Sequence, residues 1–461
     1  MRAVLMVELG GVDPGTGSEK MVIKAVRTPF AVKGANVPQP FTLAPHELAA
    51  WGTPNAVQRR GQLIRDRLRA HAGIDELLER LDRTAVDDVN PLYVVLGEGN
   101  AELISWETLC TAANHFVALD KRWPMGRISD PMSGKSRRPP TLRLPVKVMA
   151  IISAFGVPAQ EREWEILCAA MVMASKKGLD IRLKLLVGHP TMRTAIDAAI
   201  AGGRRGVEVS HIDNTASRVI QEIIAWEPNV VHFFCHGLGD ATDQSLELAT
   251  ASDYLDAGMT SGSVKIGIKS LVDMSLSLDD PWLLTLNCCA SGQAAKDLHS
   301  MAHQVVSAGF PAAIAMLEPV AASDAHEFTR AFYASVFGSL LRAKETLEAQ
   351  PYVPFEWAHA MYDARTAIRD LHNRGPESSR EWTLPVLYVR GVEPLNFLRP
   401  HSDLSEKVVR EYKLKAQLCA DWLQVISEVV SAEERLAVMK KTLADVPDEF
   451  WPTVDGTFPN V

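Results

Sequence analysis

The sequence has few cysteines, no long hydrophobic run and no excess of positive charge, and each absence excludes a class of protein. Its 461 residues include only six irregularly spaced cysteines, which excludes a disulfide framework and favours a reducing, cytoplasmic compartment. No apolar run reaches the roughly 18 residues of a membrane-spanning helix, and the N-terminus lacks the features of a signal peptide. A net charge of -8 argues against a general role in binding nucleic acid.

Glycine-rich loops and regular metal-binding spacings are also missing. The segment 97–99 (GEG) lacks the third glycine of a dinucleotide-binding loop, and 133–136 (SGKS) lacks the first glycine of a phosphate-binding loop. The sequence therefore predicts no cofactor and no metal. A zinc site stays as an alternative, although no regular ligand spacing supports it. Its ligands would be His232, Cys235, His236, Cys288 and Cys289.

Apolar strands alternate with amphipathic helices from residue 146 onward. The pattern predicts strands at 146–154, 180–188, 206–212, 229–237, 281–289, 311–320 and 383–391. It predicts helices between the early strands at 162–178, 190–203 and 216–228. Continuous apolar strands separated by helices indicate an α/β fold, with a mostly parallel sheet covered by helices on both faces.

The flanking regions have a different pattern. Strand-like and helical segments in the first 100 residues predict a smaller accessory α/β region, and proline, glycine and charge at 123–143 predict a linker or surface loop. Beyond Pro400 the pattern predicts only helices. We therefore expect three regions: an accessory α/β region at 1–145, a main α/β domain at 146–395 and a helical extension at 396–461.

Two predicted strands end in a reactive residue that is followed by small residues. One ends in His236 and Gly237, and the other ends in Cys288 and Cys289, followed by Ala-Ser-Gly. The carboxyl ends of parallel strands meet at one edge of a sheet, where side chains and backbone N–H groups become free to face a substrate. We expect a sharp turn at the glycines, and a helix after Gly292 whose positive end favours a thiolate. A thiolate, an imidazole and free N–H groups are the parts of a cysteine peptidase.

The two motifs resemble those of the caspase-like clan of cysteine peptidases. HFFCHG at 232–237, followed about 50 residues later by LNCCASG at 286–292, is similar to the CHAT domain and more distantly to separase. LYVVLGEGNAELISWETL at 92–109 resembles a family strand with its "PWE" segment, although Ser105 stands where proline is usual. The resemblance covers roughly residues 85–395.

Two later segments extend the resemblance. Residues 311–337 resemble the strand and helix that follow the nucleophile, with Glu318 in place of a common tryptophan. Residues 384–391 resemble the closing strand of the family. The resemblance implies a caspase-like catalytic domain at 146–395, and it makes the region at 1–145 a pseudo-caspase-like accessory.

The resemblance also implies roles for individual residues. The family pattern Cys-x-(Ser/Thr)-Gly selects Cys289 as nucleophile, His236 matches the catalytic histidine, and Gly237 with Cys289 would supply the oxyanion N–H groups. Cys288 is one position earlier and so faces the other side of its strand, as a core residue. Relatives that cut after basic residues carry a carboxylate beyond the nucleophile, which makes Glu318 and Asp324 substrate-pocket candidates. Either could instead cap the helix that begins near Asp324.

The resemblance implies regulated proteolysis of a protein partner in a bacterial pathway, in anti-phage defence or cell death. It also implies a second protein that activates or inhibits the peptidase. We expect this chain itself to make no direct contact with nucleic acid or membrane. Two other functions stay open. One is a catalytically inactive caspase-like scaffold that binds a protein partner, and the other is a nucleotide-binding or sensor domain, which has only the architecture in its favour.

Overall fold

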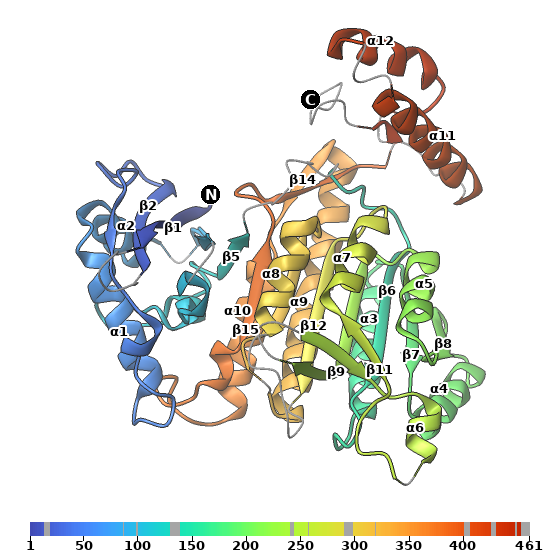
Figure 1. Ribbon diagram of the computed structural model, residues 1–461, viewed down its shortest axis with the longest axis horizontal. Helices are drawn as coiled ribbons and strands as arrows, with labels where there is room; N and C mark the ends of the chain where they lie inside the picture. The colour runs from blue at the N-terminus through green and yellow to red at the C-terminus, as the bar shows by residue number, and fades with distance from the viewer. Residues whose placement is uncertain are drawn as a thin grey trace. The chain divides into compact units, whose positions relative to one another are not determined.

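A computed structural model of the chain describes all residues except 13–18, 86, 98–99, 130–138, 240–243, 257, 290–297, 319, 401–405, 426–429, 448–449 and 453–461. The chain divides into two compact units (Figure 1). The first unit comprises Met1–Met132, Leu144–Arg342 and Glu356–Pro394. The second unit comprises Ser133–Arg143, Ala343–Phe355 and Leu395–Val461.

A mixed sheet is the core of the first unit, and among the described residues it has fourteen strands. Along the main path the order is β3 (Gln39–Phe41), β2 (Glu19–Arg27), β1 (Ala3–Val12), β4 (Leu92–Leu96), β5 (Met125–Ser129), β15 (Pro385–Val389), β13 (Ala312–Met316), β12 (Leu283–Cys289), β9 (Val230–Gly239), β6 (Val146–Ser153), β7 (Ile181–Val187) and β8 (Val207–His211). A hairpin of β10 (Gln244–Leu248) and β11 (Val264–Gly267) extends from β9.

Most neighbouring strands are parallel, as the sequence predicts. The strands from β12 through β9, β6 and β7 to β8 are all parallel, and so are β1, β4 and β5. Antiparallel pairs occur at the β1–β2–β3 edge, at β13–β15 and in the β9–β10–β11 segment. The predicted α/β class with a mostly parallel sheet is therefore confirmed.

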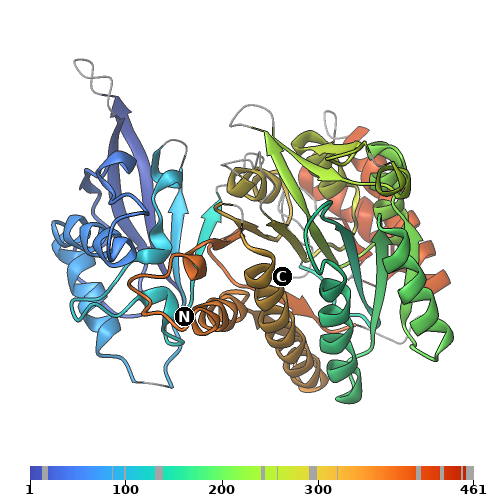
Figure 2. The same ribbon diagram turned by 90° about the horizontal axis from the view of Figure 1, so that it is seen from below.

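Helices cover both faces of this sheet. On the strands around β9, α3 (Glu161–Lys176) and α9 (Ala322–Ala349) lie on one face, and α7 (Ile268–Ser277) and α8 (Leu298–Ala308) lie on the other (Figure 2). The remaining helices of this unit are α1 (Ala56–Arg69), α2 (Ala72–Asp82), α4 (Pro190–Ala201), α5 (Ala216–Trp226), α6 (Ala251–Leu255) and α10 (Ala358–Leu371). Short 3-10 turns are Pro45–Glu47, Asn100–Leu103, Trp106–Thr108, Val117–Leu119 and Glu381–Thr383.

The predicted linker at 123–143 is wrong for its first part. Met125–Ser129 form β5, a fully buried strand between β4 and β15. The charged residue Arg127 interrupts the apolar pattern by which a buried strand is recognised in the sequence. It can be buried because the Glu107 carboxylate lies 2.7 Å from its guanidinium group. One sheet thus joins strands from the accessory region to those of the main domain. The boundaries at 145 and 395 stay a prediction.

The second unit contains a helical pair and a small sheet. Helices α11 (Glu406–Val425) and α12 (Ala432–Thr442) pack through a separate apolar core. Its buried members are Ala416, Cys419, Leu423, Met439, Leu443, Val446, Phe450 and Trp451. Strand β14 (Tyr352–Phe355) pairs antiparallel with β16 (Leu395–Leu398). In neither unit does a described helix have the length and apolar character needed to cross a membrane.

Candidate functional site

The backbone register brings the two predicted catalytic positions together. In the parallel pair of β12 and β9, Cys289 is the Cα partner of His236, and Cys288 is the partner of Cys235. Both strands end at the same edge of the sheet, within three residues of this pair. The side chains of Cys288 and Cys289 lie outside the described part of the chain, so the roles predicted for them stay predictions.

The imidazole ring of His236 is buried and held by a backbone carbonyl. Its Nε2 lies 2.6 Å from the carbonyl oxygen of Phe155. Because a carbonyl oxygen only accepts hydrogen bonds, Nε2 carries the proton. In the neutral ring, Nδ1 is then the unprotonated nitrogen, and this is the tautomer in which Nδ1 can accept a proton.

The loop that carries this carbonyl is fixed by side chains. Oε1 of Gln160 accepts hydrogen bonds from the Ala154 backbone N–H at 3.3 Å and from the Tyr254 hydroxyl at 3.1 Å. The rings of Phe155 and Tyr254 pack with centroids 4.8 Å apart. Sequence reasoning missed this support, because a backbone carbonyl has no sequence signature and Tyr254 is almost 100 residues away along the chain.

The predicted turn directly after His236 is wrong. Strand β9 continues through Gly239 and pairs antiparallel with β10, so that Gly237 is opposite Leu246. The physical reason is a change of partner: β6 ends at Ser153, which pairs with Cys235, and β10 then supplies the neighbouring strand. The sequence predicts that a helix begins just after Gly292. That start lies within residues 290–297, which the structure does not describe, so it stays a prediction.

The two substrate-pocket candidates each have a partner within the protein. Glu318 follows β13 and forms an ion pair with Arg380, whose Nη1 lies 3.0 Å from Oε2. Asp324 is buried in the first turn of α9, where its Oδ1 accepts a hydrogen bond from His372 Nε2 at 2.7 Å. Burial raises the pKa of Asp324, although His372 opposes this effect. Both pocket roles stay predictions.

A buried carboxylate that sequence reasoning missed lies on the same face as His236. Glu163 of α3 is fully buried, and its Oε1 accepts hydrogen bonds from His232 Nε2 at 2.9 Å, Asn287 Nδ2 at 3.2 Å and Thr329 Oγ1 at 2.5 Å. Its Oε2 accepts one from His326 Nδ1 at 2.7 Å. These five residues come from α3, β9, β12 and α9, so the carboxylate connects both strands of the site to the helices that cover them.

The carboxylate of Glu163 is held ionised by these donors. Burial alone raises its pKa, but the hydrogen bonds from His232 and His326 outweigh burial and lower the pKa to about 2. The other ring nitrogen of His232 lies 3.1 Å from the Tyr333 hydroxyl. Among the described residues, no group of three or more His, Cys, Asp and Glu side chains has an arrangement that could hold a metal ion. The only sequence signal for the cluster was the period of two that places His232 and His236 on one strand face.

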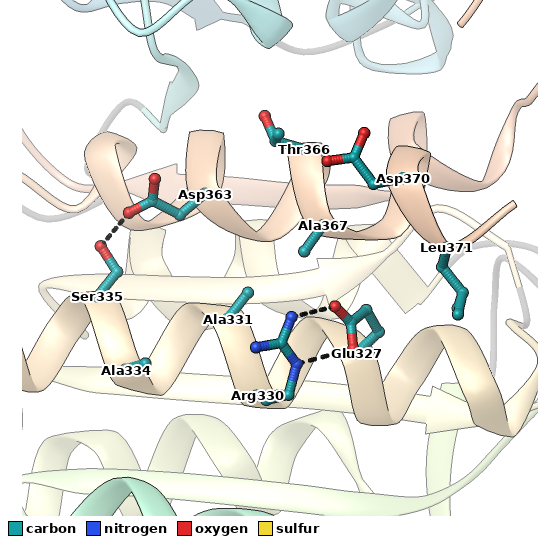
Figure 3. Close-up of a pocket in the computed structure, with 10 residues that line it drawn as sticks. All are labelled: Glu327, Arg330, Ala331, Ala334, Ser335, Asp363, Thr366, Ala367, Asp370 and Leu371. Atoms are coloured by element: carbon teal, nitrogen blue, oxygen red, sulfur yellow. Dashed lines mark hydrogen bonds and ion pairs between the residues drawn. The ribbon is translucent and has the colours of Figure 1, made fainter. Parts of the chain in front are cut away.

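A surface groove of about 480 Å³ lies between α9 and α10 (Figure 3). Alanines 331, 334 and 367 line it, and the Ser335 hydroxyl donates a hydrogen bond to Asp363 across it at 2.5 Å. Arg330 on its rim is paired with Glu327. None of the predicted site residues lines this groove, so it is separate from the strand ends.

One comparison with known protein families gives a match that covers well over half of the chain. A family model described as the CHAT domain matches residues 72–372, which include both His236 and Cys289. A sequence search of curated proteins found no significant match.

Three solved structures resemble the chain at low sequence identity. The Arg-specific cysteine proteinase gingipain R aligns over 77% of this chain and 71% of its own, with 12% identity and a TM-score of 0.40. The complex of the Porphyromonas gingivalis RgpB pro- and mature domains aligns over 77% and 72%, with 10% identity and a TM-score of 0.40. The Saccharomyces cerevisiae separase–securin complex aligns over 72% of this chain and 17% of its own, with 10% identity and a TM-score of 0.31.

Proposed function

Because the chain belongs to the CHAT-domain family, we propose that it is a caspase-like cysteine endopeptidase with His236 and Cys289 as its catalytic pair. The observation that supports this most is the register of β9 and β12, in which these two residues are direct partners. Neighbouring strands are about 4.8 Å apart, so the two positions are close enough for a sulfur and an imidazole to act on one amide.

The proposed reaction has two steps. The Cys289 thiolate attacks the carbonyl carbon of a peptide bond, and His236 donates a proton to the leaving amine. Water then hydrolyses the resulting thioester. The backbone N–H groups of Gly237 and Cys289 would bind the oxyanion, since Gly237 directly follows His236 and Cys289 is the last residue of β12. The carbonyl of Phe155 supports the role of His236, because it leaves Nδ1 as the proton-accepting nitrogen.

The substrate in this proposal is a protein, cut in a regulated bacterial pathway of anti-phage defence or cell death. A second protein would activate or inhibit the enzyme. For Glu318 to bind a basic substrate side chain, that side chain would have to displace Arg380, so an Arg380→Ala variant should strengthen any preference for arginine or lysine. Asp324 is a weaker candidate because it is buried against His372.

Profiling of new protein N-termini tests the proposed function. Cells that express the wild-type chain with its regulatory partner should contain fragments that are missing from cells with Cys289→Ala. The sequences around the cut sites would give the specificity. Identical fragment sets, with the partner still bound by both variants, would instead identify the chain as an inactive scaffold.

A further inference from the structure

A histidine–carboxylate pair, His326 and Glu163, lies on the sheet face that carries His236. Alternate residues of a strand share a face, so His232, Phe234 and His236 lie in line along β9. In the register, Asn287 is beside Phe234 and Cys289 is beside His236. The ring of His326 stacks on Phe234, with centroids 5.3 Å apart and planes at 15°. His326 therefore lies over Phe234, whose position is one step, about 6.6 Å along the strand, from that of His236.

The two nitrogens of His326 have different surroundings. Nδ1 lies 2.7 Å from Oε2 of Glu163, and it carries a proton because the carboxylate can only accept. Nε2 is on the far side of the ring and buried, and among the residues that the structure describes it has no hydrogen-bond partner. The contrast with His232 is informative, because both of its nitrogens have partners. A buried polar atom without a partner requires an explanation, and for this nitrogen we take it to be a water molecule or substrate group that binds during the reaction.

This arrangement matches that of a histidine general base. In hydrolytic enzymes a carboxylate on one ring nitrogen orients the ring and stabilises the imidazolium, and the other nitrogen accepts the proton. Glu163 and His326 have this arrangement with a charged oxygen. The partner of His236 Nε2, by contrast, is a neutral backbone carbonyl, that of Phe155.

Building on the proposed function, we propose that His326 is the general base for the second step of the reaction and that Glu163 is its positioning residue. A water oxygen attacks the acyl carbon of the Cys289 thioester, and a proton of that water moves to Nε2 of His326. The carbon–sulfur bond then breaks, its electron pair stays on sulfur, and the acid product leaves. The proton on His326 then passes to the Cys289–His236 pair, which returns to the thiolate and protonated imidazole that begin the first step. His236 keeps its role in the first step.

A burst experiment with 4-nitrophenyl acetate separates the two steps. The wild-type protein should release one equivalent of nitrophenol rapidly, and this burst should be absent from Cys289→Ala. His326→Gln should keep the burst and slow the steady phase about 100-fold, because a general base contributes roughly this factor. Intact mass should show the acetylated protein accumulating. Glu163→Gln should also slow the steady phase and keep the burst.

The His303–Glu102 pair supplies a matched control. His303 also contacts a glutamate through Nδ1, at 3.2 Å, but it lies on α8 and has no place in the proposed reaction. His303→Gln should therefore leave both phases unchanged. The size of the burst measures the fraction of protein that is folded and reactive at Cys289. If His326→Gln does not fold, His326→Asn is used in its place.

Two results would overturn the proposal while leaving the proposed function intact. One is a His326→Gln variant that hydrolyses its acetyl group at the wild-type rate. The other is a variant in which the burst and the steady phase fall together with the melting temperature, because that identifies a packing role. A wild-type protein with no Cys289-dependent burst would overturn the proposed function as well as this inference.

Discussion

The Cα positions of His236 and Cys289 are partners in the register of two adjacent parallel strands. The pairing fixes the two positions through the backbone hydrogen bonds of β9 and β12 rather than through loops. Side chains from α3 and α9 then form hydrogen bonds with both strands, at His232 and Asn287, which precede the pair along β9 and β12. A site built on paired strands is held more rigidly than one built on loops, which suits a reaction that needs fixed distances.

Loosening the loop that carries the Phe155 carbonyl should impair His236. Gln160→Ala removes the acceptor for the Ala154 N–H and the Tyr254 hydroxyl, so the carbonyl loses its fixed position. We expect the rate of alkylation at Cys289 near neutral pH to fall about tenfold, the effect of roughly one pKa unit. Quantitative mass spectrometry of the Cys289 peptide measures this rate. The exposed Gln221 is the control, and equal rates for Gln160→Ala and Gln221→Ala would contradict the proposed support.

The buried ion pair of Glu107 and Arg127 should be essential for stability. Both side chains are fully buried, and Arg365 is a second buried cation 3.9 Å from Glu107. Glu107→Gln leaves these guanidinium groups without a counter-charge, which should cost about 3–5 kcal/mol of unfolding free energy. Urea unfolding measures this loss. In the exposed Glu76–Arg80 pair, Glu76→Gln should cost less than about 0.5 kcal/mol, and similar losses for both would contradict the argument.

Gly188, just after β7, should not tolerate a side chain. A Cβ atom there would lie 1.9 Å from the Ala249 carbonyl oxygen, which also accepts a hydrogen bond from Ser153 at the end of β6. Gly188→Ala should therefore destabilise the protein by about 2 kcal/mol or more. Gly52→Ala is the control, because nothing lies within 4 Å of its added Cβ. Equal melting temperatures for the two variants would show that the backbone can move aside.

Acid should remove the contribution of Glu163 to stability. Its pKa in the folded protein is about 2, below the ordinary value of 4.5 that applies to the unfolded chain. A lowered pKa stabilises the fold above the unfolded value, so this contribution is complete above pH 4.5 and is lost as the pH falls towards 2. Between pH 6 and pH 3, wild type should lose up to about 2 kcal/mol more than Glu163→Gln, because about 1.5 of the 2.5 pKa units of stabilisation are lost in this interval. Urea unfolding at the two pH values tests this, and equal losses would contradict an ionised Glu163.

The sequence predicts the parts of the fold that have an apolar period. Continuous apolar strands such as β6, β9 and β12 are visible in it, and so are the residues at their ends. It misses β5, because Arg127 looks like a surface residue until Glu107 is placed beside it. It also ends β9 too early, because a glycine after histidine is typical of a turn, whereas here β10 continues the pairing.

The chemistry around His236 is less accessible to sequence reasoning. The acceptor from Phe155 is a backbone atom, which any residue could supply. Glu163, Asn287 and His326 are far apart along the chain, and each one alone is typical of a helix surface or a strand end. Only the packing of α3 and α9 on the sheet brings them together.

Labelling with a thiol-reactive peptide probe tests the central claim most directly. The account predicts that the wild-type protein is labelled at Cys289. Cys289→Ala should abolish labelling, His236→Ala should slow it strongly, and Cys288→Ala should retain it. Labelling that persists in Cys289→Ala, or that is equally fast in His236→Ala, would show that these two residues do not act as a pair.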